Sequence, residues 1–258
     1  MVTTQQAHAF VSGADLRGLP DYHSALAVLG APGFEPDTDK TQSVLVGSTI
    51  NSFVKGVTAE RRNAINDSSL FAQLVANKKV PKQSDVIAWY DAYFEALTNV
   101  GWTLQSRSFA TYEAGSQDAD VHEAILTVAS GLLGGTASAG YALIKLTLDA
   151  LKKLSDSSPW ITMFSRESQH EKAARFQVSL VNQDANQDFL VSLMAFTLEA
   201  SQTVEQVLFF KFKSMTATLR QFSGDVTIND RVLNHVAPLI AQKVDAFYDG
   251  YVLGVDLR

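Results

Sequence analysis

Residues 174–200 read ARFQVSLVNQDANQDFLVSLMAFTLEA. At the start of this stretch, Phe176 and Val178 alternate with polar residues, which is the two-residue period of a β-strand. After a polar turn at 182–186, the run 189–200 is apolar at both odd and even positions. A strand of that composition is buried on both faces, and short connections join antiparallel neighbours. The stretch therefore predicts two antiparallel strands inside the protein.

A third apolar run follows at 207–219 and begins with VLFFKFK. In a strand, Phe210 and Phe212 would point to one face of the sheet and Phe209 to the other. Together the three runs predict an antiparallel β-meander over 174–220. We expect helices to cover both of its apolar faces, or one face to open onto a cavity.

Helical patterns precede and follow this meander. Apolar residues at i, i+4, i+7 and i+8 from Val46 predict a helix, and helical periodicity continues over 41–100. A switch to two-residue alternation predicts a strand over 101–113. A final helix is expected over 229–250, with a kink or restart at Pro238.

The first 40 residues contain Pro20, Pro32 and Pro36 together with several glycines. That density predicts an irregular arm over 1–40 that lies on the surface. The order of elements predicts the α+β class, with a helical N-terminal half, an antiparallel β-meander covered by helices, and a C-terminal helix. We expect a single domain over 1–258.

The segment 124–144, AILTVASGLLGGTASAGYALI, has 21 residues and no charge. That length would cross a bilayer core as a helix. Its seven strongly apolar residues favour insertion by only about 2–4 kcal/mol, and eight glycine, serine or threonine residues oppose it. The composition therefore argues against a permanent membrane span. A break at Gly134–Gly135 instead predicts a glycine-notched helical hairpin over 118–154.

Small residues recur at four-residue spacing in this hairpin, which is typical of closely packed helices. The residues predicted to pack are Gly131, Gly134, Gly135 and Gly140. A hairpin buried in the domain is the simplest interpretation. The alternatives are a hairpin that lines an apolar cavity and one that contacts a membrane under some conditions.

Composition and charge exclude several functions. The net charge of −6 and the pI near 5.3 argue against nucleic-acid binding and against electrostatic attraction to anionic lipids. The chain has no cysteine, which excludes disulfides, thiolate metal sites, cysteine nucleophiles and S-acylation. The first residues lack the pattern of a secretory signal. We therefore expect a cytoplasmic protein or one exported without a cleaved signal peptide, in either case able to associate with membranes.

No residues carry a recognisable catalytic or metal-binding motif. Asp118, Asp120 and His122 resemble a metal-binding set, but an acidic helix cap explains them better. The segment 136–140, TASAG, departs from the nucleophile elbow G-x-S-x-G at its first residue, and a helical pattern precedes it. We predict no catalytic residue and no metal ligand. An active site assembled from dispersed residues stays open.

In size, leaderless start and order of elements, the chain resembles the Erwinia virulence factor (Evf) family. The resemblance rests on this layout, on the glycine-rich apolar helices at 121–150 and on the apolar strands at 189–219. It implies an α/β protein with a central hydrophobic cavity, a fatty-acyl group on a cysteine, and association with membranes. Because this chain has no cysteine, the resemblance leaves only a non-covalent fatty-acyl ligand.

The leading hypothesis is therefore a non-enzymatic, lipid- or membrane-interacting protein of the secreted-effector or virulence type. We expect no nucleic-acid partner and no cofactor beyond an acyl ligand, and the sequence leaves the oligomeric state open. The alternatives are an enzyme with a dispersed active site and an interaction protein with a fully packed core. The residues predicted to contact lipid are Leu132, Leu133, Tyr141, Phe209 and Phe210.

Overall fold

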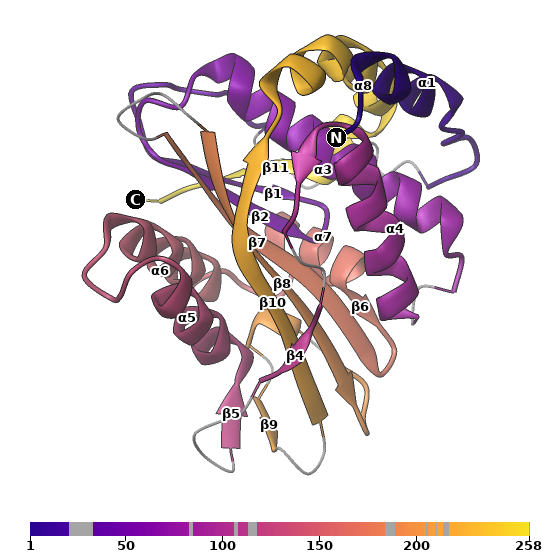
Figure 1. Ribbon diagram of the computed structural model, residues 1–258. Coiled ribbons are helices and arrows are strands. Elements are labelled where there is room, and N and C mark those ends of the chain that lie inside the picture. The colour runs from indigo at the N-terminus through magenta and orange to yellow at the C-terminus, as the bar shows by residue number, and fades with distance from the viewer. Residues whose placement is uncertain are drawn as a thin grey trace.

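A long twisted sheet forms the centre of the computed structural model (Figure 1). The structure describes residues 1–20, 33–82, 85–105, 108–112, 118–183, 189–204, 206–209, 211–213 and 217–257. Within these ranges, nine strands form the main sheet in the order β11-β1-β2-β7-β8-β10-β3, with β4 beside β10 and β6 beside β7. The strands are β1 (Gln42–Val46), β2 (Thr49–Phe53), β3 (Trp102–Thr103), β4 (Ala110–Thr111), β6 (Gln169–His170), β7 (Ala173–Gln183), β8 (Phe189–Ala200), β10 (Ala217–Ile228) and β11 (Val252–Val255).

The predicted meander is present as β7, β8 and β10, which pair antiparallel along their length. Phe176 lies opposite Phe196 in this register, and Val226 lies opposite Val191. A parallel contact between β2 and β7 joins the meander to the remaining strands. The helices and this mostly antiparallel sheet confirm the α+β class.

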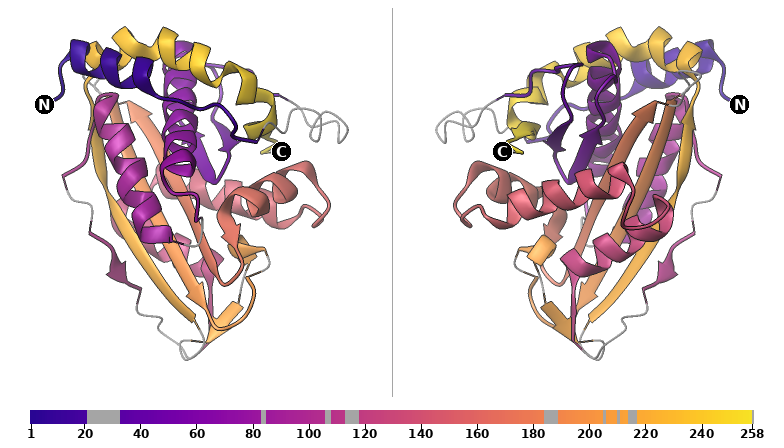
Figure 2. Two further views of the ribbon diagram at one scale, coloured as in Figure 1. Left: turned by 90° about the vertical axis from the view of Figure 1, so that its right-hand side faces the viewer. Right: turned by 90° about the vertical axis from the view of Figure 1, so that its left-hand side faces the viewer.

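Helices cover both faces of the sheet, as Figures 1 and 2 show. The helices are α1 (Thr4–Gly13), α3 (Ala59–Lys79), α4 (Val86–Asn99), α5 (Val121–Leu132), α6 (Ala139–Lys152), α7 (Pro159–Ser168) and α8 (Asp230–Tyr251). α1, α3, α4 and α8 contribute to one apolar core, and α5, α6 and α7 contribute to a second core across the sheet. The predicted double burial of β8 is confirmed, because Val191 and Leu193 join the first core while Met194 and Phe196 join the second.

The helix predicted from Val46 is wrong, because the chain forms the hairpin β1–β2 there. Gly47, with φ of +55°, occupies the two-residue turn. Along β1, Val44 and Val46 face the first core and Leu45 faces the second. Because both faces of this hairpin need apolar residues, its sequence lacks the alternation of apolar and polar residues by which a strand is recognised. The apolar residues match the spacing of a helix only by coincidence.

The arm predicted over 1–40 is irregular only in part. α1 occupies its first third and begins with a capping box, in which Thr3 and Gln6 bond reciprocally to backbone N–H groups. Residues 33–41 have no helix or strand, and residues 21–32 lie outside the described ranges. The prolines predicted the irregular end of the arm and gave no information about its start.

Two other segments differ from the predicted strands. The strand expected over 101–113 is reduced to β3 and β4, which pair with opposite ends of β10. The run 207–219 contains a 3₁₀ turn, η1 (Val207–Phe209), and the short strand β9 (Lys211–Lys213), which pairs with β5 (Asp118–Asp120). The third long strand of the meander is β10, and it extends to Ile228, beyond the predicted end at 220.

Candidate functional site

The predicted helical hairpin is present as α5 and α6, which contact one another beside the sheet. Asp120 caps α5 by accepting from the His122 N–H at 2.8 Å, and Ser138 caps α6 by accepting from the Tyr141 N–H at 3.1 Å. The backbone reverses between these helices at Gly134 and Gly135. Within the described parts of the chain, no helix combines the length and apolar composition needed to cross a membrane.

The described residues predicted to bind lipid lie on the face of the sheet that α5 and α6 cover, but not at one place: Phe209 lies beside His122 at the start of α5, and Leu132 and Leu133 lie at its other end. Leu132 and Leu133 lie at the end of α5, Tyr141 in the first turn of α6, and Phe209 in η1. All four are partly buried and pack against the second core. Phe210 lies outside the described residues. A small void of about 10 Å³ beside Phe209 is far below the 300–1,000 Å³ typical of a ligand pocket.

The four glycines predicted to pack helices have different surroundings. Gly134 and Gly135 have φ of +78° and +101° and form the turn. Gly131 has open space where a side chain would lie. Only Gly140 makes a close approach, because a Cβ there would lie 2.4 Å from the Leu180 Cδ2 of β7. Gly131 and Gly135 therefore do not form a helix-packing pair, since one lies in open space and the other lies in the turn.

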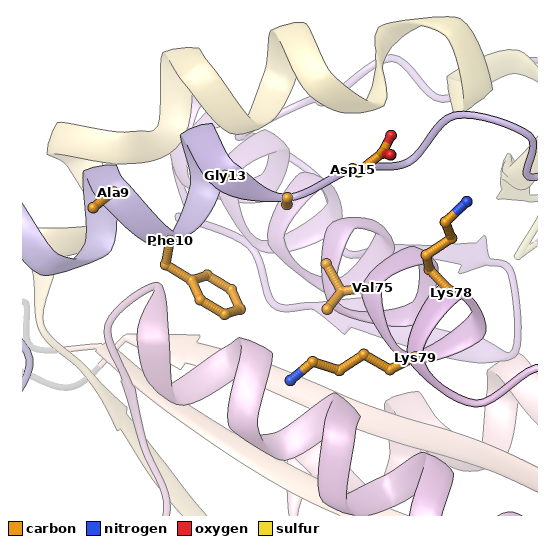
Figure 3. A pocket seen from close by; sticks show the side chains of 8 residues that line it. Ala9, Phe10, Gly13, Asp15, Val75, Lys78 and Lys79 are labelled. Carbon is orange, nitrogen blue, oxygen red and sulfur yellow. The ribbon is translucent and has the colours of Figure 1, made fainter.

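An apolar groove lies on the opposite side of the molecule, between α1 and α3 (Figure 3). Its volume of about 430 Å³ is within the range of small-molecule sites. Phe10 extends from α1 toward Val75 and Lys79 of α3, and its ring packs edge-on against Phe71 at 6.2 Å between centroids. The residues that line the groove are Ala9, Phe10, Gly13, Ala14, Asp15, Val75, Lys78 and Lys79.

Two lysines place positive charge at the edge of this groove. The Lys78 Nζ donates to the carbonyl of Arg17 at 2.6 Å, and the Lys79 Nζ pairs with the Glu95 Oε2 at 2.8 Å. Asp15 is held by Arg17, which lowers the pKa of that carboxyl well below its usual range. The groove therefore joins an apolar floor to a charged edge, the arrangement that an amphipathic ligand requires.

A second, polar pocket of about 370 Å³ lies where α7, β6, β7 and the end of α3 meet. The Arg175 guanidinium lies 4.0 Å from the ring centroid of Trp89 and donates to the Asn77 Oδ1 and the His170 Nε2. The Arg166 Nε donates to the Glu167 Oε1 at 2.7 Å. The polar residues that line this pocket are Asn77, Arg166, Glu167, His170, Arg175 and Tyr251.

Burial changes the protonation of this polar cluster. It raises the pKa of Glu167, although Arg166 beside it acts in the opposite direction. Burial, helped by the charge of Arg175, lowers the pKa of His170 to about 3, so its ring is neutral at pH 7. Burial also lowers the pKa of Arg175 to about 10. Titratable groups with shifted pKa values in a concave site are typical of functional sites and also of structural ion pairs.

Sequence reasoning missed both pockets. Phe10 and Ala9 fell in the arm predicted to be irregular, so no groove against a helix could be expected there. Adjacent lysines at the end of α3 were a visible signal, but positive residues in a last helical turn also stabilise the helix dipole. Arg166, Glu167 and Arg175 come from two elements and meet only in the fold. In the residues that the structure describes, no cluster of His, Asp and Glu could hold a metal ion.

No protein-family model and no curated protein matches the sequence. Among solved structures, the chain is similar to a delta-endotoxin at 10% identity and a TM-score of 0.38, covering 76% of this chain and 85% of that one. It is also similar to the Evf virulence factor at 12% identity and a TM-score of 0.29, covering 92% and 91%. The resemblance predicted from the layout is thus present as a weak structural similarity.

Proposed function

We propose that the protein is a non-enzymatic lipid-binding protein that holds an acyl chain without a covalent bond in the groove between α1 and α3. The observation that supports the proposal is the groove itself, with an apolar lining and with Lys78 and Lys79 at its edge. Burying an alkyl chain there would contribute about 0.8 kcal/mol for each methylene group. The carboxylate head group of a bound fatty acid would lie near Lys78 and Lys79.

The proposed site differs from the residues predicted from the sequence. Leu132, Leu133, Tyr141 and Phe209 remain the alternative place for a lipid or a membrane surface, because each is only partly buried. Their side chains already pack against the second core, whereas the α1–α3 groove offers about 430 Å³ of space. The groove is therefore the better-supported position.

Titration with decanoate and hexadecanoate, followed by native mass spectrometry and calorimetry, tests this proposal. Ala9→Trp fills the groove from an exposed position on α1, and we expect it to weaken binding at least tenfold. Ala142→Trp adds the same side chain at an exposed position on α6 and serves as the matched control. Wild-type protein that binds neither fatty acid contradicts the proposal. Weakened binding in Ala142→Trp alone would place the lipid at the hairpin.

The lysines are tested with a second matched pair. Lys78→Gln combined with Lys79→Gln removes the positive charge of the two lysines at the groove, and Lys152→Gln combined with Lys153→Gln removes the same positive charge at the end of α6. We expect only the first pair to weaken fatty-acid binding. Exposed ion pairs such as Lys79–Glu95 contribute about 0–1 kcal/mol, so the variant should stay folded.

We also propose that the protein is of the secreted-effector or virulence type, because its sequence layout resembles that of the Evf family. Membrane association is proposed with it. Flotation of the purified protein with vesicles of phosphatidylcholine and phosphatidylglycerol tests the membrane part. Protein that stays in the dense fraction at every vesicle concentration contradicts it.

The polar pocket favours a second candidate function, an enzyme with a dispersed active site. Glu167, which is buried and has a raised pKa, would be its acid–base group. The test is to incubate the protein with a mixture of small metabolites and follow turnover by mass spectrometry, with Glu167→Gln as the comparison. The enzyme hypothesis requires turnover that this variant loses.

A further inference from the structure

His122 occupies an unusual position in the first turn of α5. The residue is buried, with 7% of its surface exposed. Its Nε2 makes no hydrogen bond within the described structure and lies 3.5 Å from the Asp149 Oδ1 of α6. The ring also lies 6.5 Å from that of Phe209 in η1. One titratable side chain thus packs between both helices of the hairpin and the turn beneath them.

The charges around His122 come from both helices. Asp120 caps α5, while Lys145, Asp149 and Lys152 act from α6. Asp149 is also held by Lys145 through its second oxygen. Among the described groups, η1 contributes only the uncharged Phe209. Burial and the nearby Lys152 lower the pKa of His122 below its ordinary value, and they outweigh the opposite effect of the two carboxylates.

We propose that His122 is an acid-sensitive latch of the α5–α6 hairpin, which packs tightly while the imidazole is neutral and loosens when the ring takes up a proton. The latch does not depend on the lipid groove, which lies on the other side of the sheet. Protonation of His122 would change the stability of the α5–α6 hairpin alone, and no ligand is required.

The direction of the effect follows from the two states of the histidine. In the loosened hairpin the imidazole is solvated and titrates near its ordinary pKa of about 6.5. In the packed hairpin the pKa is lower, so the loosened state binds more protons in acid. The packed state therefore has its full stability above about pH 6.5 and loses it as the pH falls toward the lowered pKa. Over that range the opening equilibrium rises by up to tenfold per pH unit.

Loosening would expose the apolar underside of the hairpin. Ala124 and Ile125 of α5 and Ile144 and Leu148 of α6 are buried in the second core. A two-helix element that contacts the sheet through these side chains can open without disturbing the first core on the other face. Acid should thus act on the hairpin before it acts on the rest of the protein.

Amide hydrogen exchange of the full-length protein at pH 7.5 and 5.0, corrected for intrinsic exchange rates, tests the latch. We expect protection in α5 and α6 to fall at least fivefold at pH 5.0, while α3 and α4 keep theirs. His122→Gln cannot titrate and should abolish the difference. His235→Gln removes an exposed histidine on α8 and should leave the difference unchanged. If His122→Gln does not fold, His122→Phe serves as a second variant that cannot titrate, because its ring would lie beside that of Phe209.

NMR titration of the imidazole supplies an independent measurement. We expect His122 to titrate below 6.5, and Asp149→Asn to lower its pKa further because the nearest carboxylate is gone. Titration of His122 at or above 6.5 overturns the proposal. So does equal protection of α5 and α6 at both pH values in the wild type, or an acid response that persists in both non-titrating variants.

Discussion

Single residues in the hairpin show how two glycines of one sequence motif can differ. Gly140 lies in the first turn of α6, where the Leu180 side chain of β7 occupies the space that a Cβ would take. Gly131 lies in the last turn of α5 and has no neighbour within 4 Å of the position that a Cβ would take. The first glycine is required by packing and the second is not.

We therefore expect opposite effects from the same substitution at these two positions. Gly140→Ala forces Leu180 out of its place in a packed core and should lower the free energy of unfolding by about 1–3 kcal/mol. Gly131→Ala improves helix propensity and should raise it by about 0.5–1 kcal/mol. Urea denaturation of both variants measures the difference. Equal effects would show that Gly140 makes no close contact.

A second residue-scale feature is the buried hydroxyl of Tyr90 on α4. It lies 2.8 Å from the Phe176 carbonyl and 3.0 Å from the Phe196 carbonyl, and it accepts from the Gln177 Nε2 at 2.8 Å. Burial raises the pKa of this phenol well above its usual value, so it stays protonated. One hydroxyl thus joins a helix to the two central strands.

Removing this hydroxyl should leave buried polar groups without a partner. We expect Tyr90→Phe to lower the free energy of unfolding by about 1–3 kcal/mol. Tyr141→Phe changes a partly buried tyrosine in the same way and should remain within about 0.5 kcal/mol of the wild type. Chemical denaturation of the two variants compares them, and a similar small loss in both would mean that the Tyr90 hydroxyl contributes little.

At the scale of elements, the hairpin depends on where α6 begins. Ser138 has an extended backbone and accepts from the Tyr141 N–H, as an N-cap does. Ser138→Ala should destabilise the protein by about 1 kcal/mol. Thr136→Ala, in the same turn but outside the cap, should have almost no effect. Hydrogen exchange in the first turn of α6 distinguishes the two variants, and identical exchange would contradict the role of Ser138.

Elements also show which parts of the fold the sequence predicts. The strand β8 could be recognised because burial on both faces gives an unbroken apolar run, and β7 because its apolar side alternates with polar residues. The alternating polar residues do not face water, however. Gln177 bonds to Thr49 and Tyr90, and Ser179 bonds to Asn51, in a network covered by α3 and α4. A polar network and a solvated face have the same sequence pattern.

The candidate sites were less predictable than the strands. The α1–α3 groove depends on α1, which lies in a segment whose proline and glycine content predicted no helix. The polar pocket depends on Glu167 of α7 and Arg175 of β7, which meet only in the folded protein. The hairpin residues were placed on the correct helices, since uncharged composition and a glycine pair are local signals. Whether such residues enclose space depends on packing, which a local pattern does not contain.

At the scale of the whole molecule, one sheet separates two apolar cores, and a few titratable groups are buried with them. Asp67 on α3 is the clearest case in the first core, because burial raises its pKa to about 6. Its charge also contributes to the raised pKa of Tyr248 on α8. A carboxylate buried between two helices that both cover the sheet affects the stability of the whole fold.

The pH dependence of unfolding should therefore carry a signature of Asp67. In the unfolded chain an aspartate titrates near 3.9, and in the folded protein Asp67 titrates near 6, so the folded state binds the extra proton between these values. The stability that this proton gives is complete below about pH 3.9 and is lost as the pH rises through 6. Asp67→Asn cannot lose the proton, so it should gain about 2–3 kcal/mol relative to the wild type between pH 4 and pH 7.5. Urea denaturation of both proteins at these two pH values measures the gain. A stability difference that stays constant with pH would show that Asp67 is solvated in the folded protein.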